Sequence, residues 1–300
     1  MHVDGKKVFL VGDNPFHGIS HLSQEQARIR GNAMTYPEYA ANLVATSLEN
    51  GADGFMFSVS ETTLSILKTL HEKETDKRPG LYALVPYAFE YVRLATQIGI
   101  AGLAKNFAKQ ITFSGNVRAI GMGLKGVMRI DPETLLKTYL LYEISRIKSA
   151  AGKQANLESL FLHEIITDMG LAFNLDWLFK SYVEFMLKLG IKPGFNTRNF
   201  AYLVKKLDEW DISFRDVMIA APFNKVGFQM DPSKTECEKA LAVLDEANVI
   251  AISILAAGYL KPPEAMDYIG GLSNILGVSV GVSKEQHARE TFKLLKNRLD

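Results

Sequence analysis

Short apolar runs alternate with amphipathic stretches along almost the whole chain. Eight runs are apolar on both faces, a pattern typical of parallel strands covered by helices. They are residues 8–12, 54–58, 81–86, 159–163, 192–195, 217–221, 249–255 and 277–282. Helical spacing predicts helices at 36–50, 62–73, 89–109, 133–151, 175–189, 202–210, 233–247 and 263–269, and a last helix that ends at 299 with Ser283 as its N-cap.

This alternation favours one α/β domain over residues 1–300, closed as a (β/α)8 TIM barrel. An open doubly wound sheet is the alternative fold. The residues after the first strand, Gly12-Asp13-Asn14-Pro15, lack the glycine-rich fingerprint that such a sheet uses for dinucleotides.

The segment between the third and fourth strands, about 89–153, is longer than a simple repeat needs. Its stretch 91–130 has no acidic residue, but it has basic residues at 93, 105, 109, 118, 125 and 129. Two interpretations stay open: a lid or anion-contacting insertion, or an enlarged helical hairpin. The hairpin would pack on the barrel or on another subunit of a homo-oligomer.

Composition limits the classes of partner. The net charge of +1 gives no field that would select nucleic acid or an anionic membrane. No apolar run reaches the ~20 residues of a membrane span, and residues 1–7 lack a secretory core. The only cysteine, Cys237, rules out an internal disulfide. We expect a cytoplasmic protein whose partner is a small molecule.

Reacting groups of such barrels come from the C-terminal ends of the strands and the loops after them, an end called here the mouth. His163 follows the apolar run 160–162, and a histidine there can donate to a carbonyl oxygen or move a proton near neutral pH. Glu164 and Asp13 are the candidate carboxylates beside it. Other polar residues expected at this end are Asn14, His17, Ser58, Ser60, Glu61, Tyr87, Asp168, Asn196, Thr197, Arg198, Asn199, Asn224, Lys225, Ser253, Tyr259, Ser283 and Lys284.

Two other chemistries compete with proton transfer by His163. His17 and His21 could join His163, Glu164 or Asp13 around a divalent metal, although loop histidines at this spacing are more often solvated. Lys225 could form a Schiff base if it were desolvated, although an exposed loop lysine is the simpler interpretation. We therefore predict no metal ligands.

Several segments together resemble the aldo/keto reductase superfamily. They are 8–12 with Phe16-His17-Gly18, 48–55, Leu160-Phe161-Leu162-His163, 189–197, Ala221-Pro222-Phe223-Asn224, 252–260 and 280–286. The resemblance implies NADP or NAD as cofactor. It assigns Asn196 and Thr197 to the nicotinamide carboxamide, Phe223 to stacking on the nicotinamide ring, and Ser253, Leu255 and Gly258 to the pyrophosphate. It assigns Gly281, Ser283, Lys284 and Gln286 to the adenosine phosphate.

The chain departs from the family where the family's catalytic Asp, Tyr and Lys are expected. The second strand and its loop read Phe55-Met56-Phe57-Ser58-Val59-Ser60-Glu61, and the third strand ends in Val85-Pro86-Tyr87. Only His163 carries over, and Tyr87 is the candidate replacement acid. The favoured function is an oxidoreductase acting on a small carbonyl or alcohol. The alternatives are a barrel lyase, isomerase or hydrolase using His163 and nearby carboxylates, with or without a metal, and a non-catalytic ligand-binding barrel.

Overall fold

The computed structural model describes residues 6–17, 36–73, 77–86, 132–152 and 155–299. Eight parallel strands pair in chain order, and the last pairs with the first, so the sheet closes into a barrel. The strands are β1 (Val8–Gly12), β2 (Gly54–Ser58), β3 (Gly80–Val85), β4 (Leu157–Leu162), β5 (Lys192–Asn196), β6 (Met218–Pro222), β7 (Val249–Ile252) and β8 (Ile275–Gly281). The predicted fold class is confirmed.

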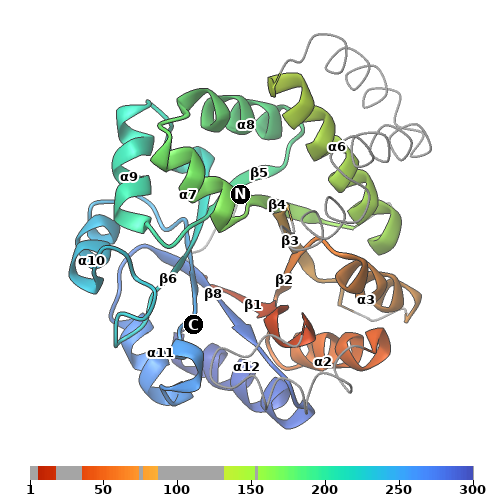
Figure 1. Cartoon of the computed structure of the whole chain (residues 1–300). Helices are drawn as coiled ribbons and strands as arrows, with labels where there is room; N and C mark the ends of the chain where they lie inside the picture. The colour runs from red at the N-terminus through yellow and green to blue at the C-terminus, as the bar shows by residue number, and fades with distance from the viewer. Residues whose placement is uncertain (1–5, 18–35, 74–76, 87–131, 153–154, 300) are drawn as a thin grey trace.

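Helices surround the strands as an outer ring (Figure 1). They are α2 (Pro37–Glu49), α3 (Glu61–Glu72), α6 (Pro132–Ala151), α7 (Glu164–Ala172), α8 (Asp176–Lys188), α9 (Phe200–Glu209), α10 (Lys234–Ala242), α11 (Pro262–Gly270) and α12 (Glu285–Leu299), with short 3-10 turns η1 (Asn14–His17), η2 (Phe214–Asp216) and η3 (Ala256–Gly258). Within the described ranges, no helix is both long enough and apolar enough to cross a membrane.

The barrel interior is a packed core in which a large side chain is matched by a glycine. Phe161 of β4 is fully buried and pairs with Gly194 of β5. A Cβ atom added to Gly194 would lie 2.4 Å from the Phe161 ring, so only glycine fits there. The interior cluster also holds Val8, Leu10, Met56, Tyr82, Met218, Ala220 and Ile250. This filling closes the barrel axis and leaves function to the mouth.

The alternate residues of each strand point outward and pack under the helices. Phe179 of α8 lies between Phe195 of β5 and Trp210, with ring centroids 5.1 Å and 4.8 Å away. The Tyr182 hydroxyl, also on α8, donates to the Leu160 carbonyl and accepts the Gly194 backbone N–H at 3.2 Å. These contacts anchor α8 to the two strands that deliver His163 and Asn196.

Replacing Tyr182 with Phe is expected to lower the free energy of unfolding by about 1–3 kcal/mol, because a fully buried N–H and carbonyl lose a partner. Tyr202→Phe is the matched control, since that ring lies on α9 and is 41% exposed. Urea unfolding followed by circular dichroism measures both. Equal stabilities of the two variants would contradict the anchoring role.

The structure differs from the sequence-based expectation mainly after β4. The sequence predicted no helix between His163 and 175, yet α7 lies there. The His163 side chain caps its first turn, and Gly170 lets α7 approach Phe179, where a Cβ would lie 2.9 Å from the ring. The helix predicted over 233–247 ends earlier, at Ala242. The helix predicted over 89–109 and the acid-free stretch 91–130 lie outside the described residues.

Candidate active site at the barrel mouth

His163 is placed at the mouth by β4 and oriented by α7. Its backbone N–H donates to Val85 of β3 at 2.8 Å, which continues the sheet ladder by one residue. Its Nδ1 accepts the Ile165 backbone N–H at 3.3 Å. Because a backbone N–H is always a donor, Nδ1 carries the lone pair and the ring proton sits on Nε2. Within the described part of the chain, no atom accepts a hydrogen bond from this Nε2–H.

The environment keeps the His163 ring neutral. Burial lowers its pKa below the ordinary value of 6.5, and the Arg198 charge adds to the shift. The carboxylates of Glu164, Asp13 and Asp168 oppose it in part. At neutral pH the ring is therefore an uncharged imidazole with one N–H to offer, which suits donation to a carbonyl oxygen.

Asp13 follows β1 and is almost fully buried. Its Oδ2 accepts the backbone N–H of Ser58, at the end of β2, at 2.7 Å. The same oxygen lies 3.1 Å from His17 Nε2. The two side chains are only 9% and 7% exposed. The carboxylate thus joins two neighbouring strands and holds a histidine.

The β4 and β5 loops are tied together by two acids of α7. Glu164 accepts two hydrogen bonds from the Arg198 guanidinium, at 2.8 Å and 3.1 Å. One helical turn later, Asp168 accepts from the Thr197 hydroxyl and, at 3.4 Å, from the Arg198 backbone N–H. Burial raises the Asp168 pKa, and its hydrogen bonds offset part of the rise. Both acids thus position the loop after β5.

Sequence reasoning placed Asp168 and Arg198 at strand ends but predicted no pairing. Glu164 and Asp168 are four residues apart, which puts both carboxylates on one face of a helix. This spacing could have indicated the pairing only if α7 had been predicted.

The three residues assigned to the nicotinamide differ in their surroundings and in the contacts that they make. Asn196, the last residue of β5, is buried, and its Nδ2 donates to the Ala220 carbonyl at 3.1 Å, which leaves its Oδ1 as an acceptor. Thr197 is fully buried and bonded to Asp168. Phe223 is also fully buried, and its ring packs edge-on against Phe200 of α9 at 5.1 Å. That ring is part of the outer core and has no exposed face.

The loop after β7 holds the residues assigned to the pyrophosphate. Ser253 has a left-handed backbone with φ of 53°, and Ala256, Ala257 and Gly258 follow with φ of 45°, 60° and 92°. Left-handed backbone at three residues other than glycine costs on the order of 1 kcal/mol each. Such strain gathers at ligand sites. Leu255 and Ser253 are partly exposed, and Gly258 is exposed.

The residues assigned to the adenosine phosphate gather where α12 begins. The helix starts at Glu285, so Lys284 and not Ser283 occupies the N-cap position. Ser283 is half-buried, and its carbonyl accepts from the Tyr39 hydroxyl at 3.3 Å. Gln286 is exposed and donates to Glu290 at 2.8 Å. Gly281 lies against Pro15, where a Cβ would approach to 2.7 Å. This end offers backbone N–H groups and a lysine to an anion.

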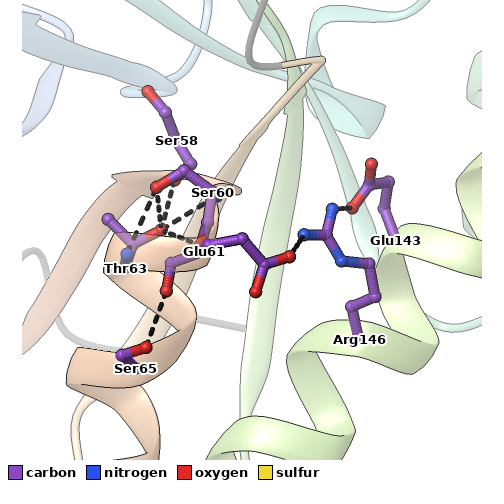
Figure 2. Close-up of polar contacts among 7 residues, drawn as sticks. All are labelled: Ser58, Ser60, Glu61, Thr63, Ser65, Glu143 and Arg146. Atoms are coloured by element: carbon purple, nitrogen blue, oxygen red, sulfur yellow. Dashed lines mark hydrogen bonds and ion pairs between the residues drawn. The ribbon is translucent and has the colours of Figure 1, made fainter. Parts of the chain in front are cut away.

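The polar residues after β2 cap one helix or connect two helices. Ser60 caps α3 in a reciprocal capping box with Thr63. Glu61 turns toward α6 and pairs with Arg146 at 2.6 Å, and the same guanidinium reaches the fully buried Glu143 at 3.0 Å (Figure 2). The contacts in this view join α3 to α6.

The competing chemistries gain no support from the described residues. Lys225 is 54% exposed and pairs with Glu264 at 2.6 Å, so it is not the desolvated amine that a Schiff base needs. No group of three or more metal-ligating side chains occurs in the described part of the chain. Burial raises the pKa of the Cys237 thiol to about 11, which makes it a poor nucleophile. Tyr87 and His21 lie outside the described residues.

No protein-family model matches the sequence, and no curated protein is significantly similar to it. Two solved structures are similar in fold, each called a "putative aldo-keto reductase" from Pseudomonas aeruginosa. The first has a TM-score of 0.60 at 10% identity and covers 97% of this chain and 90% of its own. The second has a TM-score of 0.56 at 11% identity, with 97% and 91% covered. The chain therefore has the barrel fold that the resemblance implies.

Proposed function

We propose that this chain is an oxidoreductase of aldo/keto reductase type that uses NADP or NAD and acts on a small carbonyl compound. The observation that carries the proposal is the neutral His163 ring at the end of β4, whose Nδ1 is occupied by the Ile165 N–H and whose Nε2–H has no partner in the described part of the chain. A neutral imidazole can donate to a carbonyl oxygen without carrying a charge of its own. It stabilises the negative charge that grows on that oxygen as the carbonyl is reduced.

The described residues fit a nicotinamide dinucleotide at two places. Lys284 and the N-terminus of α12 suit a phosphate, since free N–H groups and a cation converge there. The Asn196 Oδ1 can accept from a carboxamide. Phe223 does not contribute in this arrangement because its ring is buried against Phe200. When bound, the cofactor would supply the hydride, and the protein orients both reactants.

The first experiment is a titration of the purified protein with NADPH and with NADH. Quenching of Trp177 and Trp210, the only tryptophans, and a thermal shift report binding. Saturable binding near micromolar concentrations supports the proposal. Binding absent up to millimolar cofactor contradicts it and favours a barrel that kept only the scaffold.

Lys284→Ala is expected to weaken NADPH binding about tenfold, which corresponds to about 1.4 kcal/mol, because one charged contact to a phosphate is lost. Lys225→Ala is the matched control, as that exposed lysine pairs with Glu264 outside the proposed site. The Kd from fluorescence titration is compared for both. Equal losses in the two variants would assign the effect to net charge and reject the α12 site.

A further inference from the structure

We propose that a cavity at the end of the barrel opposite the mouth binds a small aromatic carboxylate. The cavity lies between the last turns of α3 and α6, two helices that pack side by side (Figure 1), and beside the start of β3. Its volume is about 260 Å³. Because the strands are parallel, their starting ends gather on the side away from the mouth. The cavity is therefore separate from the proposed active site, and binding there needs neither the cofactor nor catalysis.

The floor of the cavity is apolar. Leu67 and Leu70 of α3 and Leu81 of β3 line it, and these residues are 2%, 6% and 1% exposed. Water held against apolar walls lacks hydrogen-bond partners, so its displacement by an apolar group is favourable. An apolar cavity of about 150 Å³ is large enough to hold one benzene molecule. The larger volume here fits one aromatic ring with a short polar substituent.

Small residues at the end of α6 leave this space open. Ala151, the last residue of the helix, lines the cavity, and so does Ala155, which precedes β4. Gly152 lies between them and has a φ of 85°, which glycine adopts without strain. A Cβ atom added to Gly152 would lie 2.6 Å from the His71 ring, so this glycine lets the imidazole pack against the backbone. One wall is therefore made of small residues, with His71 held at its edge.

The polar side chains of the lining suit an anion. His71 and Arg78 are exposed, which puts them at the rim, and no carboxylate occurs among the described residues that line the cavity. Arg78 also makes another interaction, but a guanidinium carries five N–H donors, so one contact does not use them all. A guanidinium matches a carboxylate in bidentate geometry, and a neutral imidazole adds one N–H donor. An apolar floor below this rim fits an aromatic ring that bears one carboxylate.

The test is a titration of the full chain, with labelled leucine methyl groups, followed by NMR. Benzoate is expected to bind with a Kd of about 1 mM or tighter and to shift the methyl signals of Leu67, Leu70 and Leu81. Benzyl alcohol keeps the ring without the charge, and acetate keeps the charge without the ring, so each should bind at least about tenfold more weakly. Equal affinity for benzoate and benzyl alcohol would overturn the proposal. So would shifts confined to Leu255 at the mouth, or no shifts at about 10 mM benzoate.

Two variants test the rim and the wall separately. Arg78→Ala is expected to weaken benzoate binding about tenfold or more and to leave benzyl alcohol binding unchanged. Arg215→Ala is the matched control, because Arg215 is an exposed arginine at the same end of the barrel that pairs with Glu246 before β6. Ala151→Leu fills the cavity and should abolish binding, with the melting temperature as a check of folding. Equal losses in the two arginine variants, or undiminished binding in folded Ala151→Leu, would overturn the proposal, and the arginine pair decides if Ala151→Leu does not fold.

Discussion

His163→Asn lowers kcat for carbonyl reduction about 100- to 1000-fold, the loss typical for one donor to a developing oxyanion. An asparagine amide oxygen reaches roughly where Nδ1 lies, so it can still accept the Ile165 N–H and cap α7. What the variant lacks is the Nε2–H. The expected effect is therefore on chemistry, with the Kd for NADPH and the melting temperature nearly unchanged.

His163→Gln separates this interpretation from a structural one. The glutamine amide nitrogen reaches roughly where Nε2 lies, so Gln keeps a donor at the mouth and loses the cap. We expect Gln to retain more activity than Asn and to be less stable by about 1 kcal/mol, the cost of an N-cap. The ratio of kcat values and the two unfolding free energies are measured together. If Asn proves the more active variant, His163 acts through the cap and not through Nε2.

Gly194→Ala lowers the free energy of unfolding by about 3 kcal/mol or more, as overpacking of a filled core does. The added Cβ would lie 2.4 Å from the Phe161 ring, which is fully buried and has no space to retreat. The φ of Gly194 is not in the left-handed region, so the cost is steric. In a Phe161→Leu background the same change should cost at least about 1 kcal/mol less, because contacting sites couple.

Gly190→Ala is the matched control for the barrel interior. Gly190 has a φ of 71° and nothing within 4 Å of an added Cβ, so its cost is conformational only. About 1 kcal/mol is expected for it, and no change of this cost in the Phe161→Leu background. Urea unfolding of the three single and two double variants gives both coupling energies. Equal coupling at Gly190 and Gly194 would mean that the Phe161 contact is not what selects glycine.

The local patterns of the chain were enough to predict most of the barrel. The first two strands, 8–12 and 54–58, agree with the structure at both ends, because apolar runs bounded by turn residues have little choice of conformation. Periodicity missed α7, whose start depends on a cap from the histidine at the end of a strand. That cap exists only when β4 and α7 are in place.

The candidate site, too, was predicted only in part from the sequence. The sequence placed His163 at the end of a strand, and parallel strands bring all such ends to one side of the barrel. The sequence did not show which face of a strand each side chain occupies. Phe223 points outward to the helices, and a shift of one residue along a strand exchanges the two faces.

Pairing between the ends of neighbouring strands was decided by tertiary structure alone. Asp13 is hydrogen-bonded to Ser58, 45 residues away in the chain, and Glu164 is hydrogen-bonded to Arg198, 34 residues away. Such contacts depend on the pairing of neighbouring parallel strands, which no local pattern encodes. The order of the strands and of the helices other than α7 is thus a property of the sequence by itself, since local spacing of apolar residues specifies it. The burial of Phe223 against Phe200 and the contacts of Asp13 with Ser58 and of Glu164 with Arg198 depend on neighbours that only the folded barrel brings together.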